Sequence, residues 1–356
     1  MSISEALKIE HQFLMPLKEI YDDGPIISVI LDCFFGLQYI KQSVQSVIDQ
    51  DFNNVELMLI NNGASIEIST YLNEIHANNK NTSLIIFKEN QFSWGDRDKV
   101  ISICWNAALN YCKGEYVTHL GYDDMFSKNY ATKMMKLFEG SSNCLMASPL
   151  PIVVNSKGER IESSNLLSTN NRPRYVEGKK VALDVVNFSP EKMFSSPGEV
   201  FVIKKSILLK YSGFEQGIDM LQILKYAIHG DIGFDPDAHV FWRHHDSQTN
   251  RLASAKGHID VKDLKKIIKR SDIVNIWKNF FSMSEVLLLE KYLKHTIIKK
   301  PLSKAQNMIS DKNLFGLFLV FFHTSRECPE LLIKTIVHSI NFSYRIVMKK
   351  IKIFKV

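Results

Sequence analysis

Two adjacent carboxylates, Asp123 and Asp124, follow shortly after an apolar-leaning run at residues 116–120. In an α/β sheet, ligands bind beyond the carboxyl ends of the strands. Paired acids in such a place are suited to hold a hard divalent cation, which in turn neutralises the phosphates of a substrate. The alternative is an acidic doublet on a solvated turn, which is the more frequent case when no other motif accompanies it. The surrounding sequence therefore decides between the two interpretations.

The composition is that of a soluble globular protein, with 356 residues, 45% hydrophobic and 23% charged. That length suits one large domain with an appendage, and it excludes neither enzymes nor binding modules. The net charge of +6 suits an anionic partner such as nucleotide phosphates or lipid headgroups. Nucleic acid fits less well, because no recognition motif accompanies the charge.

The cysteines are odd in number and lack metal-ligand spacing: Cys33, Cys104, Cys112, Cys144 and Cys328. They predict reduced, mostly buried thiols in the cytoplasm. The first twelve residues lack the apolar core of a signal peptide. The most apolar run, Leu314–Phe322, is far shorter than the ~20 residues of a membrane helix, so no transmembrane span is predicted.

From Ile26 onward, apolar runs alternate with helical periodicities. The sequence predicts strands over 26–31, 55–60, 84–87 and 116–120, separated by helices over 40–48, 68–75 and 100–111. Such alternation favours a parallel sheet with right-handed crossovers.

The two ends of the chain differ from this alternating region. A capping box of Ser2 and Glu5 predicts a leading helix that extends to Phe13, Leu14 and Leu17. After Met125 we expect helices over 129–138 and 218–228, strands over 144–148, 200–203 and 238–242, and a polar loop over 155–180. From about residue 259 the chain looks helical and Lys-rich. The predicted division is 1–24 helical lead-in, 25–255 main domain and 256–356 basic helical region.

The order of several weak motifs resembles the family-2 glycosyltransferases of the GT-A fold, especially bacterial enzymes of capsule, lipopolysaccharide and O-antigen synthesis. The resemblance spans about residues 25–251 and rests on the acidic doublet, the helix around Asn106, and two strand ends, Asp32-Cys33-Phe34 and Asn61-Asn62-Gly63. It implies a Rossmann-like α/β fold with a mixed, mostly parallel central sheet flanked by helices. It also implies a nucleotide-sugar donor, Mn²⁺ or Mg²⁺, and an inverting displacement at the anomeric carbon.

The resemblance assigns roles to the acidic residues. Asp124 would ligate the metal, and Asp123 would orient the donor ribose or a metal-bound water. Asp219 stands second in Ile218-Asp219, where the family usually shows Glu-Asp, and is the candidate general base. Its alternative role is a helix-start carboxylate that the macrodipole stabilises. Glu215 would lie on the acceptor side and is the fallback base.

A further match is Trp242-Arg243-His244-His245, similar to the family's aromatic-Arg-x-His motif. This match implies that His245 contacts the metal or the diphosphate, with His244 as the alternative. It also implies that Arg243 contacts a phosphate. Neighbouring histidines are also often plain surface or core residues.

Donor recognition would involve Asp32, Phe34, Asn61 and Asn106, although these segments depart from the family's usual residues. Asn61 is equally explained as a turn former beside Gly63. Trp105 replaces an Arg that commonly precedes Asn106, and Arg97 or Lys99 would then supply the missing cation. Ser196, in a Ser-Ser-Pro-Gly segment, would help shape the acceptor pocket, or would simply belong to a Pro-Gly turn.

The last fourteen residues, 343–356, combine five basic side chains with large apolar ones and contain no acid. Such a segment suits an anionic membrane surface, where a glycan linked to undecaprenyl diphosphate would be the acceptor. The alternative is a C-terminal helix that packs its apolar side on the core.

The sequence as a whole favours an inverting, metal-dependent glycosyltransferase acting on a UDP-sugar, cytoplasmic or peripheral at the inner face of the plasma membrane. A sugar nucleotidyltransferase is a rival, but residues 34–37 lack the cations of its phosphate loop. A non-catalytic nucleotide-sugar or glycan-binding module of the same fold is the other alternative, because the Glu before Asp219 and the Arg before Asn106 are missing.

Overall fold

The computed structural model describes residues 2–17, 21, 24, 26–92, 99–161, 173–188, 200–214, 219–248, 268–269, 271–310, 312–327 and 329–353. These residues fall into two compact units, of which the first ends at His244 and the second begins at His245. Each unit contains its own cluster of buried apolar side chains. The division into a catalytic domain ending at 255 and an appendage stays a prediction.

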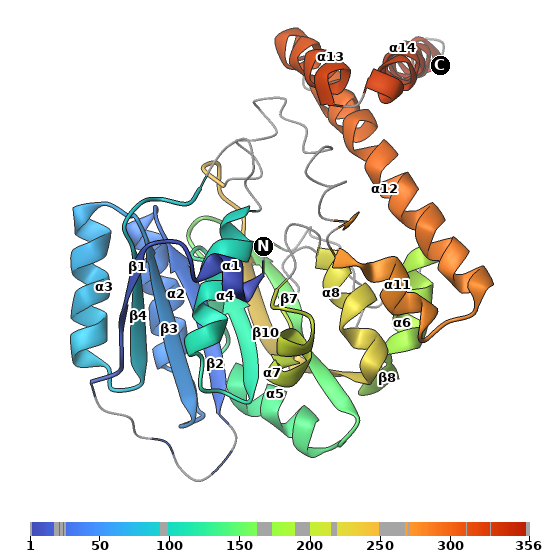
Figure 1. Cartoon of the computed structure of the whole chain (residues 1–356). Helices are drawn as coiled ribbons and strands as arrows, with labels where there is room; N and C mark the ends of the chain where they lie inside the picture. Colours follow the sequence, from blue (N-terminus) through green and yellow to red (C-terminus); the bar gives the residue numbers. More distant parts are fainter. Residues whose placement is uncertain are drawn as a thin grey trace. The chain divides into compact units, whose positions relative to one another are not determined.

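Among the described residues, a ten-stranded mixed sheet forms the centre of the first unit (Figure 1). The strand order is β1–β4–β3–β2–β5–β9–β7–β10–β6, with β8 paired to β10. The bounds are β1 His11–Leu14, β2 Ile27–Cys33, β3 Val55–Asn62, β4 Thr82–Phe87, β5 Tyr116–Leu120, β6 Met125–Phe126, β7 Cys144–Val154, β8 Tyr175–Glu177, β9 Val202–Lys204 and β10 Asp231–Arg243. Strands β4, β3, β2 and β5 are parallel, which confirms the α/β fold predicted from the alternating pattern.

Helices cover both faces of this sheet. They are α1 Ile3–Ala6, α2 Leu37–Ile48, α3 Ile66–Asn78, α4 Lys99–Tyr111, α5 Tyr130–Glu139, α6 Gly178–Val186, α7 Lys205–Lys210 and α8 Asp219–Lys225. Ile40 and Val44 lie one turn apart on α2 and are buried in one cluster with Val29 and Leu31 of β2. Helix α4 lies on the opposite face (Figure 1).

Two expectations about local structure are wrong. The capping box of Ser2 and Glu5 is present, but α1 is a single turn. Phe13 and Leu14 instead belong to β1, which adds an antiparallel edge to β4, and Phe13 stacks on Tyr111 with ring centroids 4.0 Å apart. The polar loop expected over 155–180 runs into β8 and α6, because Val181, Ala182 and Val185 bury one side of that helix.

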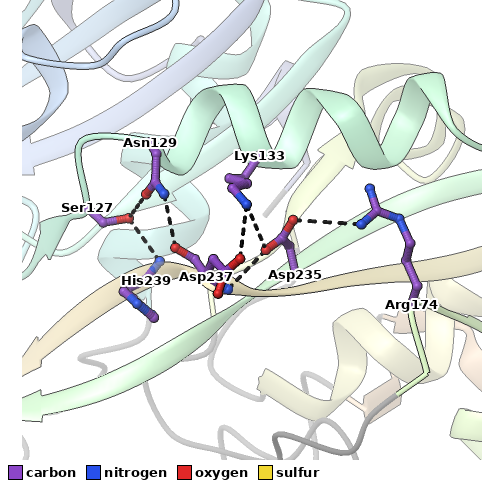
Figure 2. A network of polar contacts seen from close by, with 7 residues as sticks. All are labelled: Ser127, Asn129, Lys133, Arg174, Asp235, Asp237 and His239. Atoms are coloured by element: carbon purple, nitrogen blue, oxygen red, sulfur yellow. Dashed lines mark hydrogen bonds and ion pairs between the residues drawn. The ribbon is translucent and has the colours of Figure 1, made fainter.

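A polar network braces strand β10 against helix α5 (Figure 2). Asp235 pairs with Pro149 of β7 and His239 with Leu150, so β10 carries extra residues between them. Lys133 of α5 lies 3.1 Å from Asp237 Oδ2 and 3.8 Å from the buried Asp235. The Ser127 hydroxyl accepts the His239 N–H at 3.0 Å. The network therefore fixes the bulged part of the strand whose last residue is Arg243.

The second unit is helical, as expected. It contains α11 Ile273–Lys278, α12 Met283–Ser310, α13 Leu314–Glu327 and α14 Pro329–Ile353. The last three pack around Ala305, Met308, Val320 and Leu331. In the part of the chain that the structure describes, no helix has both the length and the apolar character needed to cross a bilayer.

The cysteines also agree with the sequence. Cys33, Cys104, Cys112 and Cys144 are buried free thiols, and Cys328 lies outside the described residues.

Candidate active site

The acidic doublet occupies the tight turn between β5 and β6, beyond the carboxyl ends of parallel strands β2 and β5. Gly121 begins this turn, and the Asp124 N–H donates to its carbonyl at 3.1 Å. A Cβ placed on Gly121 would lie 2.9 Å from Asp124 Oδ2 and 3.1 Å from Asp123 Oδ1. Both carboxylates therefore face the same small volume above the glycine.

Helix α2 holds the backbone of this turn. Ser43, fully buried, donates its hydroxyl to the carbonyls of Tyr122 and Asp124. One turn further along, the Ser46 hydroxyl accepts the Phe126 N–H at 3.1 Å. The backbone of the turn is thus held by the protein itself. Groups that stabilise a ligand's charge act most strongly when they are positioned in advance.

Arg243, at the end of β10, holds the turn from the other side. Its backbone N–H donates to Asp124 Oδ1 at 2.9 Å, and its Nε donates to the Asp123 carbonyl at 2.7 Å. The two terminal nitrogens donate to Ser156 O at 2.9 Å and Gln42 Oε1 at 2.7 Å. The side chain is fully buried. This geometry makes Arg243 a positioning residue of the doublet, while its predicted contact with donor phosphate stays a prediction.

The charged form of Asp124 is electrostatically unfavourable in the folded protein. Burial raises the pKa of the Asp124 carboxyl well above its ordinary value, and the Asp123 charge raises that pKa further. The Arg243 N–H and guanidinium oppose this shift. A bound cation would relieve the repulsion between the two carboxylates.

Asp32 is the penultimate residue of β2 and lies next to this turn. Burial raises its pKa, the hydrogen bond from Trp105 lowers it, and Asp123 is close enough to raise it again. Trp105 Nε1 donates to Asp32 Oδ1 at 3.2 Å. The Trp105 ring also stacks on His119 at 3.8 Å, and burial lowers the pKa of that histidine to about 3. A neutral donor thus stands where the family's usual arginine would bring a charge.

Phe34 belongs to an aromatic cluster at the same end of the sheet. Its ring lies 4.5 Å from that of Phe35, 5.4 Å from Phe92 and 5.8 Å from Tyr122. Asp32, Phe34, Asp123 and Asp124 are therefore brought together at the carboxyl ends of β2 and β5.

The amides of Asn61 and Asn106 are used within the fold. Asn61 accepts the Ala64 N–H at 3.0 Å and donates to the Ser69 hydroxyl at 2.9 Å, so it shapes the turn before α3. Asn106 accepts the Phe214 N–H at 2.6 Å and donates to the Phe214 carbonyl at 3.1 Å. Their contacts with a donor stay predictions.

The remaining assigned residues are placed only in part. Asp219 begins α8, as expected for a helix-start acid, but its side chain is not described. His245 belongs to the second unit, where its Nδ1 lies 2.8 Å from the Ser247 hydroxyl. Arg97, Ser196 and Glu215 lie outside the described residues. The convergence of Asp124, Asp219 and His245 in one cleft stays a prediction.

The doublet fits a hard divalent cation that is shared with a substrate. Such cations take oxygen ligands, and at phosphate sites one or two carboxylates suffice because the substrate and water supply the rest. Asp123 and Asp124 present two oxygens to one volume, and the surroundings raise the pKa of Asp124 and so disfavour its charge. A complete protein cage is a different matter: the described residues contain no group of three or more His, Cys, Asp or Glu arranged to hold a metal.

The sequence reasoning missed the residues that hold the turn. Ser43 and Gln42 lie on α2 with no motif around them, so no local signal identifies them. For Arg243 the sequence did contain a signal. An arginine at a strand end can bind a carboxylate of the protein as well as a ligand phosphate, so a role in holding the acidic doublet could have been predicted.

Comparison with known proteins agrees with the fold. S. aureus TarS 1-349, solved in complex with UDP-GlcNAc, superimposes with a TM-score of 0.58 at 12% identity and 89% coverage of both chains. Among curated proteins, an uncharacterized glycosyltransferase of Rickettsia typhi is 23% identical over 322 residues, 84% of this chain and 89% of its own. An uncharacterized glycosyltransferase of Haemophilus influenzae is 27% identical over 134 residues, 37% of this chain and 39% of that relative, so this match spans about two fifths of the relative's length.

The fold is of the GT-A type. Residues 28–195, a little under half of the chain, match the family described as Glycosyl transferase family 2.

Proposed function

We propose that this protein is an inverting, metal-dependent glycosyltransferase that moves a sugar from a UDP-sugar to a hydroxyl of a glycan or lipid-linked oligosaccharide. The observation that carries the proposal is the pair of carboxylates held over Gly121 by Ser43 and Arg243. The UDP-sugar bound by TarS supports the choice of donor. We further propose a role in bacterial surface polysaccharide synthesis, in capsule or lipopolysaccharide, at the inner face of the plasma membrane.

Asp124 would hold Mn²⁺ or Mg²⁺, and Asp123 would orient the donor ribose or a metal-bound water. When bound, such an ion supplies charge stabilisation for the departing nucleoside diphosphate. Arg243 and Ser43 keep both carboxylates in position, so little reorganisation is needed during the reaction. His245 is proposed as a further ligand of the cation or the diphosphate.

The other assigned residues complete the proposal. Asp219 would accept the proton of the acceptor hydroxyl as that oxygen attacks the anomeric carbon. Asp32 and Phe34, at the end of β2, would face the nucleoside, with Asn61, Asn106, Arg97 and Arg243 on the donor side. Glu215 and Ser196 would contribute to the acceptor side.

The test is release of nucleoside diphosphate from a panel of UDP-, GDP- and dTDP-sugars with Mn²⁺. We expect Asp124→Ala to lose turnover by about 10²–10³-fold, together with metal-dependent donor binding. Asp219→Asn should lose turnover but keep donor binding, measured by thermal shift.

Full turnover in both variants would overturn the site. Donor binding without turnover in the wild type, across all donors and acceptors tried, would instead favour the non-catalytic module. Release of pyrophosphate from a nucleoside triphosphate and a sugar phosphate would favour the nucleotidyltransferase.

A further inference from the structure

Helices α13 and α14 place large apolar side chains outward. On α13, Leu314, Phe315, Phe318 and Phe322 are between 50% and 81% exposed. On α14, Ile333, Ile336, Val337, Ile340 and Tyr344 are between 36% and 74% exposed. Their spacing of three and four residues puts each set on one side of its helix. We call these nine residues the apolar face.

The opposite sides of the same helices are partly polar and buried. Thr324 of α13 and Thr335 and Ser339 of α14 are at most 4% exposed. Each hydroxyl donates to the carbonyl four residues earlier on its own helix, at 2.7 to 2.9 Å. These hydroxyls are satisfied within the helix and therefore need no water. Val320 and Leu331 are also buried on these sides, so the helix pair carries apolar side chains both inward and outward.

Scattered exposed apolar residues are normal, but a contiguous set on two packed helices marks an interaction surface. Charge identifies the partner. After Glu330 the chain contains no acid, whereas Lys334, Arg345, Lys349, Lys350, Lys352 and Lys355 are basic. A second copy of the chain on the same face would bring these basic residues close to one another. A partner with an acidic surface would instead attract them.

We propose that the apolar face inserts into the headgroup boundary of a bilayer that contains anionic lipids, with the basic end of α14 as its electrostatic contact. Amphipathic helices of this kind bind through buried apolar area together with attraction to anionic headgroups. The inference rests on the membrane location given above under Proposed function and deepens it, because it assigns the surface. It extends that surface from the terminal fourteen residues to α13 and the first part of α14.

The test is co-sedimentation of the full chain with vesicles of phosphatidylcholine alone and of phosphatidylcholine with phosphatidylglycerol. We expect binding to the anionic vesicles to exceed binding to neutral ones by about tenfold and to weaken as salt rises. The double variant Phe315→Ser with Phe318→Ser should reduce binding by about tenfold or more. Lys349→Gln with Lys350→Gln should reduce only the preference for anionic lipid.

The matched control is Ile66→Ser, an equally exposed apolar residue (79%) on α3 of the first unit. It should bind vesicles like the wild type. Equal sedimentation of the wild type and the Phe variant would overturn the inference. So would a dimer in lipid-free solution that the Phe variant dissociates, because the face would then be an interface between copies.

Release of nucleoside diphosphate, when water or a water-soluble acceptor takes the sugar, should be the same in the Phe variant and the wild type. Vesicle binding without any turnover would count against the proposed chemistry alone, and turnover without vesicle binding would count against this surface alone.

Discussion

Two buried carboxylates, Glu56 and Asp124, lie at opposite ends of one set of parallel strands, and their surroundings differ. Glu56, near the start of β3, is fully buried, and its Oε2 accepts the Ser28 hydroxyl and the Lys113 N–H, the latter at 2.9 Å. Asp124, beyond the end of β5, accepts the Arg243 N–H on Oδ1. Burial raises the pKa of both groups. The two groups differ in their charged neighbours: only Asp124 has a second carboxylate among the groups that raise its pKa.

For Glu56, the hydrogen bonds and the Lys205 ammonium lower the pKa again. For Asp124, the Arg243 N–H and guanidinium also lower the pKa, but the neighbouring Asp123 raises it further. The carboxylate at the amino end thus serves the fold, because it joins β2, β3 and the segment before β5. The carboxylate at the carboxyl end is held in place beside a second acid, which suits the proposed cation site.

The largest expected effect is on stability at the amino end. Glu56→Ala leaves the Ser28 hydroxyl and the Lys113 N–H without their acceptor, and it opens a cavity. We expect a loss of about 3 kcal/mol in the free energy of unfolding, measured by urea denaturation. Turnover per folded molecule should stay within about twofold of the wild type. The Glu56→Gln variant, which keeps an acceptor oxygen, should lose less. A fall in turnover as large as that in stability would show that the two ends are not separate.

Next in size is a change at the carboxyl end. Gly121→Ala introduces a methyl group 2.9 Å from Asp124 Oδ2, so the carboxylates must move apart. We expect turnover to fall about 30-fold, equivalent to about 2 kcal/mol in activation free energy, with the midpoint of thermal unfolding nearly unchanged. Gly24→Ala is the control, since a methyl group there meets only the end of the Asn54 side chain at 3.3 Å. Full activity of Gly121→Ala would mean that the spacing of the doublet is unimportant.

The smallest expected effect concerns pH. A carboxyl whose pKa is raised in the folded state favours folding while it is protonated, and that contribution is lost as pH rises through the folded-state pKa. Asp124→Asn does not ionise, so its melting temperature should match the wild type in acid and exceed it by about 1–3 °C near neutral pH. Saturating Mn²⁺ should remove this advantage, because only the wild type binds the ion there. An advantage unaffected by Mn²⁺ would contradict a cation site at Asp124.

Much of the first unit was predictable, because its central strands are buried on both faces and so appear as continuous apolar runs. Strand β1 was not, since Phe13 and Leu14 fit a helix as well as an edge strand, and pairing with β4 decided between them. Helix α6 was not predicted either, because the residues that precede it are polar and indicate a loop. At the site, the types and order of Asp32, Asp123 and Asp124 were visible in the sequence. The partners of Arg243, Asn61 and Asn106 were not, because a sequence shows that a polar group exists without showing whether protein or ligand satisfies it.

The Asn106 amide couples two distant positions of the chain. Gly213 has φ of +109°, and a Cβ on it would lie 2.2 Å from Asn106 Oδ1. Residue 213 must therefore lack a side chain for as long as residue 106 is an asparagine that clasps Phe214. The positive φ by itself also favours glycine at 213, so replacing Asn106 would remove the steric conflict but not the strain of a side chain there. Any redesign of the chain around Phe214 therefore has to keep Gly213.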